Sequence, residues 1–153
     1  MLIGLIYSVT LKRNQEQINE LIQFITWLKI DLRYNKSQLC DMFDRVCSSS
    51  KFNHLNFLNS LKGNMVNMTF PAAWEKSIID WNSSISSDDK ALLKSMSGIL
   101  GASDSNGQIM ALEHIEHIFK ISLQSAIEVY NKKGKLFRSL GILIGLAVLV
   151  IFM

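Results

Sequence analysis

An uncharged apolar run, 139–153, forms the C-terminal end of the chain, and every Lys, Arg, Asp and Glu precedes it. As a helix this run is only ~22 Å long, shorter than a hydrocarbon core of ~30 Å. Starting the helix at Leu136, with the side chain of Arg138 reaching the headgroups, gives ~27 Å. We therefore predict a transmembrane helix over 136–153, in preference to the buried core helix that such short runs also form.

A shorter apolar segment, 1–11, lies at the N-terminal end, and Lys12 and Arg13 follow it. It covers ~16 Å of helix, about half a bilayer. A secretory signal peptide carries its positive charges before the apolar stretch, so this segment is not an export signal. Three interpretations stay open: half of a re-entrant hairpin, an interfacial anchor, or a full span whose beginning is missing because the start was set too late.

Basic residues flank both apolar segments on the side that faces the middle of the chain. They are Lys12 and Arg13 after the first segment, and Lys132, Lys133, Lys135 and Arg138 around the start of the second. Lys and Arg beside membrane segments stay on the cytoplasmic side. We therefore predict a cytoplasmic domain over 12–135, with both termini pointing into or across the membrane.

The distribution of charge favours lipid over nucleic acid as a partner. The chain has a net charge of +3, yet residues 14–131 carry 10 Lys and Arg against 13 Asp and Glu, a net of −3. The basicity is thus concentrated beside the membrane segments, where it attracts anionic lipid headgroups. No basic stripe remains for phosphate contacts, so nucleic-acid binding is excluded.

Apolar residues recur at helical spacing through the body. From Ile18 to Leu32 they form one face of a first helix of about 20 residues, and Phe24 on another side indicates more than one packing neighbour. The same spacing predicts further helices over 39–47, 55–61, 72–81 and 91–100.

Several residues mark helix ends in this pattern. Ser37 is the expected N-cap of the second helix, and Pro71 suits the first turn of the fourth. Ser86 and Asp89 have the spacing of a capping box at the start of the fifth helix. Gly101 is expected to end that helix in the left-handed conformation.

The last helix is predicted to be the longest. Ser103 or Asp104 offers its cap, and from about Asn106 apolar positions keep helical spacing into the membrane segment, over more than 40 residues, with Gly134 as the expected point of bending. The predicted fold is therefore all-α, a cytoplasmic bundle of about six helices whose last helix continues into a transmembrane helix.

The sequence offers little catalytic chemistry. One helix carries carboxylate and imidazole groups at the spacing of bundle metal sites, namely Glu113, His114, Glu116 and His117. The second Glu-x-x-His motif that such a site needs is absent from the sequence, so we expect a solvated face. His54 stands apart and is expected to be a satisfied surface histidine. Without a Gly-rich phosphate loop either, we predict no enzyme activity, no cofactor, no metal and no small-molecule substrate.

One motif in the predicted membrane helix concerns packing. Gly141 and Gly145 lie four residues apart on one helix face, where the missing side chains let another helix approach closely. Because glycine is common in membrane helices, the alternative that these two are incidental stays open.

The order of motifs along the chain resembles a known family. The most specific stretches are Leu100-Gly101-x-Ser103-Asp104-x-x-x-Gln108 and Lys133-x-Lys135-Leu136-x-Arg138, continuing to Gly141 and Gly145. Upstream, Asp31, Tyr34, Leu39 and the pair Ala73-Trp74 also follow its pattern. Over essentially its whole length the chain resembles stage III sporulation protein AB of endospore-forming bacteria. Gln38 departs from the family's Pro, and the N-terminal apolar segment is shorter than the family's first span.

This resemblance implies a non-enzymatic platform or scaffold subunit of the channel that links mother cell and forespore. The family's helical body is similar to the cytoplasmic domains of F-type platform proteins of type II secretion and type IV pilus systems. By that analogy the protein lies in the mother-cell membrane around the forespore, and its partners are other channel subunits, including a secretion-type ATPase, and further copies of itself. The alternative is a membrane-tethered helical adaptor or receptor that regulates a cytosolic enzyme.

Overall fold

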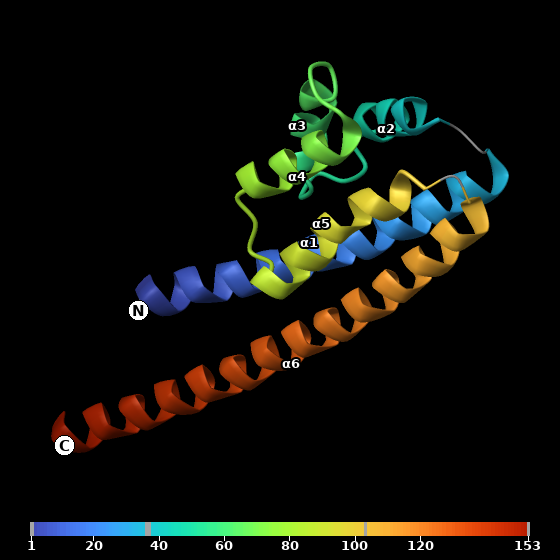
Figure 1. The fold of residues 1–153 in the computed structure, drawn as a ribbon. Helices are drawn as coiled ribbons and strands as arrows, with labels where there is room; N and C mark the ends of the chain where they lie inside the picture. The colour runs from blue at the N-terminus through green and yellow to red at the C-terminus, as the bar shows by residue number, and fades with distance from the viewer. Residues whose placement is uncertain (1, 36–37, 103, 153) are drawn as a thin grey trace.

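The computed structural model describes residues 2–35, 38–102 and 104–152, and these residues form helices without any strand. The elements are α1 (Leu2–Tyr34), α2 (Leu39–Ser48), α3 (Phe57–Asn64), α4 (Phe70–Asp80), α5 (Ser87–Leu100) and α6 (Ser105–Phe152) (Figure 1). The prediction of an all-α fold with six helices is confirmed.

Two long helices, α1 and α6, form the axis of the molecule. They run antiparallel, so that the start of α1 and the end of α6 lie at the same end of the molecule (Figure 1). The expected first helix of about 20 residues is too short, because α1 spans 33 residues and includes the N-terminal apolar segment. Lys12 and Arg13 are good helix formers and no Gly or Pro follows them, so nothing in the sequence interrupts the helix there.

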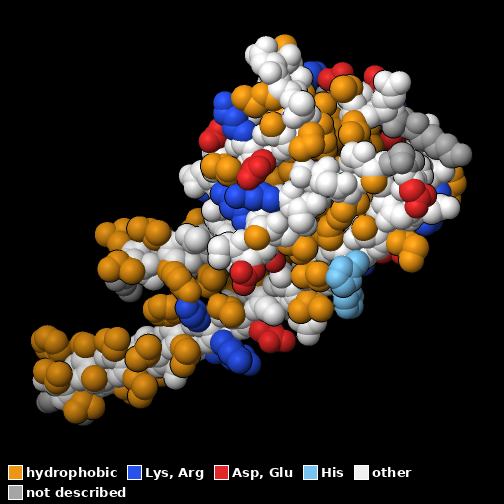
Figure 2. All heavy atoms as spheres, in the orientation of Figure 1, with side chains coloured by type: hydrophobic (Ala, Val, Ile, Leu, Met, Phe, Trp, Pro, Cys, Tyr) orange, Lys and Arg blue, Asp and Glu red, His pale blue; other side chains and the backbone are white. Residues whose placement is uncertain are grey.

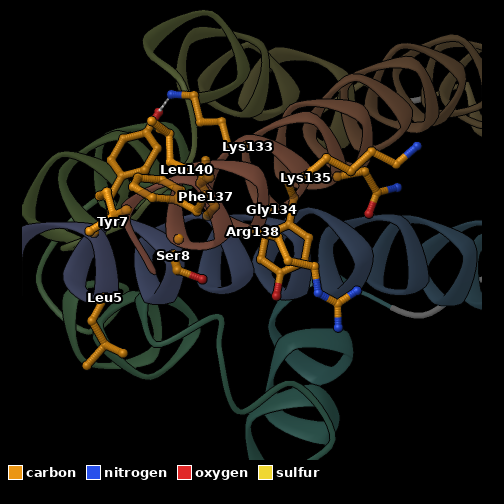
Figure 3. A pocket seen from close by; sticks show the side chains of 15 residues that line it. Leu5, Tyr7, Ser8, Lys133, Gly134, Lys135, Phe137, Arg138 and Leu140 are labelled. Carbon is orange, nitrogen blue, oxygen red and sulfur yellow. Dashed lines mark hydrogen bonds between the residues drawn. The ribbon is translucent and has the colours of Figure 1, made fainter. Parts of the chain in front are cut away.

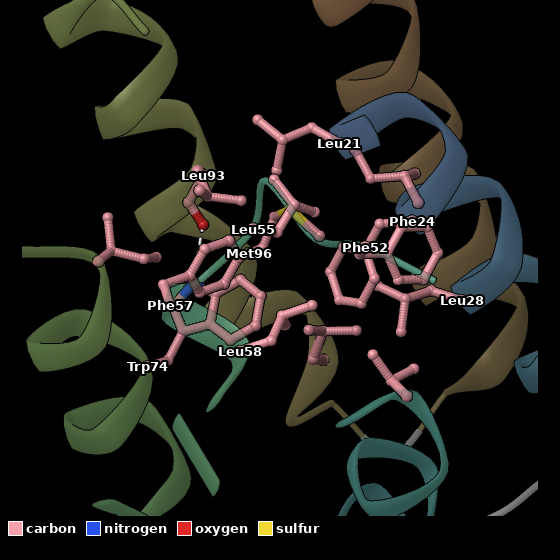
Figure 4. Close-up of a cluster of buried hydrophobic side chains, with 14 of the residues drawn as sticks. Leu21, Phe24, Leu28, Phe52, Leu55, Phe57, Leu58, Trp74, Leu93 and Met96 are labelled. Atoms are coloured by element: carbon pink, nitrogen blue, oxygen red, sulfur yellow. Dashed lines mark hydrogen bonds between the residues drawn. The ribbon is translucent and has the colours of Figure 1, made fainter. Parts of the chain in front are cut away.

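The shorter helices pack in chain order, α2 on α3, α3 on α4 and α4 on α5, and α5 packs on α6. Phe24 connects α1 to these helices, because its ring lies against Phe43 of α2 and Trp74 of α4. The core contains Leu21, Phe24 and Leu28 of α1, each with 0% of its surface exposed, facing the buried ring of Trp74 in α4 (Figure 4). The indole N–H of Trp74 donates a hydrogen bond of 2.9 Å to the carbonyl of Leu93 in α5. Four aromatic rings, one each from α1, α2, α3 and α4, lie against Trp74, which explains why Phe24 of α1 is buried.

Some of the residues predicted to mark helix ends do so in the structure. Pro71 lies in the first turn of α4, and the Ser86 hydroxyl accepts from the amide of Asp89 at 3.1 Å, as predicted. The capping box is wrong in its second half, because the carboxylate of Asp89 accepts from the hydroxyl of Ser122 at 2.7 Å instead of reaching back. Ser37 lies outside the described residues, and the N-cap position of α2 is Gln38.

Two glycines behave differently from expectation. Gly101 follows α5 with φ −87° and ψ −5°, a right-handed conformation, so the predicted left-handed ending is wrong. The chain turns there through the bond from the amide of Ala102 to the carbonyl of Ile99, 3.1 Å long. α6 continues through Gly134 without interruption, along a gentle curve (Figure 1). Its 48 residues agree with the long last helix expected from the sequence.

Candidate membrane interface

The C-terminal part of α6 projects from the body with its apolar side chains uncovered. Large apolar residues from Leu136 to Phe152 are between 48% and 87% exposed. Among the described residues α6 is the one helix long and apolar enough to cross a membrane, and none of its most apolar stretch is buried. An exposed apolar surface of this extent is typical of contact with lipid or with another protein.

The first turns of α1 form a second apolar projection beside it (Figure 2). Leu2, Ile3 and Leu5 are at least two-thirds exposed. This segment contacts α6 at two places. A Cβ on Gly4 would lie 3.4 Å from the ring of Phe137, so the absent side chain lets that ring approach the helix. One turn along, the ammonium of Lys133 hydrogen-bonds the Tyr7 hydroxyl and lies 4.0 Å from the centre of its ring.

An open groove of about 1030 Å³ follows this contact, between the start of α1 and residues 130–144 of α6 (Figure 3). Its wall on α1 includes Leu5, Ser8 and Leu11. Its wall on α6 runs from polar to apolar, over Tyr130, Asn131, Lys133, Gly134, Lys135, Phe137, Arg138, Leu140, Gly141 and Ile144.

The predicted membrane-flanking basic residues gather where the two projections leave the body (Figure 2). The amide of Gln15 donates to the carbonyl of Ala126 and Tyr7 meets Lys133, so Lys12 and Arg13 lie between these two contacts, beside residues 126–133 of α6. The guanidinium of Arg13 donates to the carbonyl of Asn82 at 3.0 Å, which ties the linker before α5 to α1.

None of these basic residues belongs to an ion pair within the described part of the chain. The cluster, hereafter the basic collar, comprises Lys12, Arg13, Lys132, Lys133, Lys135 and Arg138. Its positive charge is therefore available to an anion from outside the protein.

Further from the projections, an ion-pair cluster joins α1 to α6. Glu116 is 7% exposed and accepts from Lys29 of α1, from Lys120 at 2.9 Å and from the Thr26 hydroxyl at 3.3 Å. Burial raises the pKa of Glu116, but hydrogen bonds and charge from Lys29 and Lys120 outweigh it, so its pKa is lowered. The expected solvated face is thus wrong for Glu116, because the α1 side chains opposite supply the charges that make its burial tolerable.

The neighbouring polar residues of α6 remain at the surface. Glu113, His114 and His117 are exposed, and only Glu113 comes near a charged group of α1, 3.9 Å from Arg33. No group of three or more metal-ligating side chains occurs among residues 2–35, 38–102 and 104–152.

The family-motif stretch lies at the opposite end of the helix pair, in the turn between α5 and α6. Asp104 caps α6, because its carboxylate accepts from the amides of Asn106 at 3.2 Å and Gly107 at 3.0 Å, as predicted. Gln108 is buried and its amide donates to the carbonyl of Ala102. Leu100 is buried and Gly101 exposed, while Ser103 lies outside the described residues.

This motif therefore builds the turn that starts α6. A Cβ on Gly107 would lie 2.7 Å from a carboxylate oxygen of Asp104, so a larger residue there would displace the end of the capping side chain. Sequence reasoning did not single out Gly107, although its position three residues after Asp104 is where a capped amide lies. It also missed Gly4, Tyr7 and Phe137, whose roles depend on the register between α1 and α6.

Comparison with known proteins gives one match. No curated protein and no solved structure matches the chain at a significant level. The family model described as stage III sporulation protein AB matches residues 1–153. The match covers the full chain, including the turn before α6 and the apolar end of that helix. The chain belongs to the stage III sporulation protein AB family.

Proposed function

We propose that this protein is a non-enzymatic membrane platform subunit of the channel between mother cell and forespore during endospore formation. Family membership supports a role in sporulation. The observation that carries the membrane role is the uncovered apolar end of α6, bordered on the body side by the basic collar. We assign residues 136–153 to a transmembrane helix and residues 12–135 to the cytoplasm. Residues 1–11 form a shorter apolar arm that enters only the cytoplasmic leaflet of the same membrane.

The orientation follows from the basic collar. Positive side chains beside a span stay cytoplasmic, and both apolar arms leave the body at the same end. The body then lies on the cytoplasmic side, and by family membership the membrane is that of the mother cell around the forespore. α6 is ~72 Å long at 1.5 Å per residue, so it reaches from the bilayer to the far end of the body.

That far end offers a surface for a cytosolic partner. Tyr34 at the end of α1 is 74% exposed and Met110 near the start of α6 is 71% exposed, with Ile30 one turn before Tyr34 at 53%. Large apolar side chains exposed together are typical of protein contact sites. We propose that a secretion-type ATPase of the same machine binds here.

The membrane end offers a second surface. A Cβ on Gly141 or Gly145 would meet no atom of the described chain within 4 Å, so the backbone of α6 is open to approach there. We propose that a transmembrane helix of another channel subunit, or of a second copy of this chain, packs along this glycine face.

Deleting residues 139–153 tests the membrane role. The truncated protein is expected to move from the membrane fraction to the soluble fraction, apart from a remainder held by the N-terminal arm. Wild type and a variant with those residues replaced by a polyleucine segment serve as controls that stay in membranes. Quantitative retention of the truncated protein after an alkaline wash contradicts a C-terminal anchor.

Affinity purification from sporulating cells in mild detergent tests the partner. A large assembly that contains a secretion-type ATPase is expected, and Tyr34→Ser with Met110→Ser should remove the ATPase without lowering the melting temperature. The matched control is Val66→Ser, since Val66 is 80% exposed in the turn after α3, away from this end. Recovery of a single small cytosolic enzyme instead identifies the protein as a membrane-tethered adaptor.

A further inference from the structure

Two glycines of α6, Gly134 and Gly141, line the groove between α1 and α6. A Cβ on Gly134 or Gly141 would have no heavy atom of the described chain within 4 Å, in contrast to Gly4, which the Phe137 ring approaches. The groove is therefore accessible from the side of the helix pair, and a ligand could contact the backbone of α6 there (Figure 3).

The chemistry of the groove changes along its length. The body end presents three cations, Lys133, Lys135 and Arg138, and the other end presents Leu140 and Ile144. The rise along α6 from the first cation to the last apolar residue is ~16 Å, close to the ~15 Å of one hydrocarbon leaflet. A phospholipid has the same order of polarity, with a charged headgroup above an apolar chain.

The three cations at the body end of the groove have no acidic partner within the described part of the chain. No ion pair recorded for residues 2–35, 38–102 and 104–152 includes Lys133, Lys135 or Arg138. The ammonium of Lys133 is held against Tyr7, 4.0 Å from its ring centre, so part of the rim is ordered before a ligand binds. An apolar transmembrane helix in the groove would leave these charges without a counter-charge.

We propose that the groove is a binding site for one anionic glycerophospholipid. Its phosphate lies against Lys135 and Arg138, its glycerol group lies over Gly134, and one acyl chain runs along the groove toward Leu140 and Ile144. This inference rests on the proposed function in one respect, namely that the C-terminal part of α6 lies in the bilayer. The proposed function requires only that the end of α6 is apolar enough to enter the bilayer. The lipid site requires in addition that one anionic lipid binds in the groove.

Native mass spectrometry of the full-length protein in mild detergent tests the site. The probes are phosphatidylglycerol and phosphatidylcholine, added separately at equal concentration. Wild type is expected to retain one phosphatidylglycerol in preference to phosphatidylcholine. Lys135→Gln and Arg138→Gln should each weaken that retention about five-fold, which corresponds to the ~1 kcal/mol of one cation near an anionic headgroup.

A variant that fills the groove separates specific binding from general attraction. Gly134→Leu places a side chain in open space, so folding should be unchanged while phosphatidylglycerol retention falls to the level of phosphatidylcholine. The matched control is Ser139→Leu, which adds the same side chain on the other side of α6, outside the groove. Glycerol phosphate, which carries the anionic group without acyl chains, should not displace the lipid.

Three results overturn the proposal: equal retention of the two lipids by wild type, wild-type retention by Gly134→Leu, or displacement by glycerol phosphate. Loss of association with a second protein in Gly134→Leu, with lipid retention intact, would assign the groove to a helix and also overturn the proposal.

Flotation of each variant with vesicles of both lipids is measured in parallel. Failure of wild type to float contradicts the proposed membrane role, whereas normal flotation without lipid preference contradicts only the lipid site.

Discussion

Replacing Glu116 by Gln tests the ion-pair cluster that joins α1 to α6 inside the body. The carboxylate is buried and accepts from Lys29, whose side chain is 18% exposed, and from Lys120, whose side chain is 58% exposed. The exposed pair contributes little because solvent screens it. The pair with Lys29 dominates, and Gln keeps one oxygen as a neutral acceptor for it.

The expected loss follows from that difference. A hydrogen bond to a charged group is worth ~1.5–3 kcal/mol, so Glu116→Gln should lower the free energy of unfolding by ~2 kcal/mol at pH 7. Glu116→Ala leaves Lys29 without any partner and should cost ~3–5 kcal/mol. The double variant Glu116→Leu, Lys29→Met removes both charges and should be close to wild type in stability.

The pH dependence gives an independent check. The pKa of Glu116 in the folded protein lies below its ordinary value of 4.5, so the carboxylate contributes stability at pH values above 4.5. This contribution is lost as the pH falls through the lowered pKa. The difference in unfolding free energy between wild type and Glu116→Gln should therefore be full at pH 7 and shrink at pH values below 4.5.

Urea unfolding of the full chain in mild detergent measures these changes, followed by the fluorescence of the three Trp residues, all in the body. Glu113→Gln is the matched control, because its carboxylate is exposed and 3.9 Å from Arg33, and its effect should stay within ~0.5 kcal/mol. The reasoning is refuted if Glu116→Gln behaves like this control, or if its effect is the same at pH 4 and pH 7.

Three further outcomes are expected. Asp104→Ala removes the cap of α6 and should lower the unfolding free energy by ~1 kcal/mol, measured by urea titration; an unchanged midpoint combined with lost channel function would make this turn a partner site instead. Trp74→Phe leaves a small cavity and removes the buried hydrogen bond to the carbonyl of Leu93, for a loss of ~2–3 kcal/mol; a loss below ~1 kcal/mol would contradict that hydrogen bond. Gly141→Ile with Gly145→Ile should reduce crosslinking to the neighbouring membrane helix while the protein stays in the membrane; unchanged crosslinking would make these glycines incidental.

Local patterns in the sequence predict the helices and several of their ends. Pro71 has the fixed φ of a first helical turn, and Ser86 and Asp104 accept from amides within three residues, so their local spacing contains the needed information. The long last helix follows from an unbroken apolar period. Gly101 is the exception, since its conformation depends on how the next turn packs, and the chain there keeps a right-handed turn.

Partners distant in the sequence could not be predicted in this way. Glu116 is paired with Lys29 on another helix, and His54, expected to be a satisfied surface residue, lies 2.6 Å from the carboxylate of Glu20 in α1. Such pairs depend on the offset between helices, which no local pattern contains. The basic collar was predictable, because charge and position along the chain are enough to identify it. The groove beside Gly134 was not predictable, because it depends on the offset between α1 and α6.

Because α6 is continuous, a change in bilayer thickness that alters the tilt of its membrane part also moves its cytoplasmic end. The part of α6 from Ser105 to Lys135 lies outside the proposed span and is ~45 Å long. If the helix moves as a rigid rod, a change of tilt of ~10° in the membrane, well within the range that transmembrane helices adopt, displaces its far end by ~8 Å. That distance is comparable to the separation of two packed helices, so a lever of this length would convert a small adjustment to the lipid into a change of register at the cytosolic end.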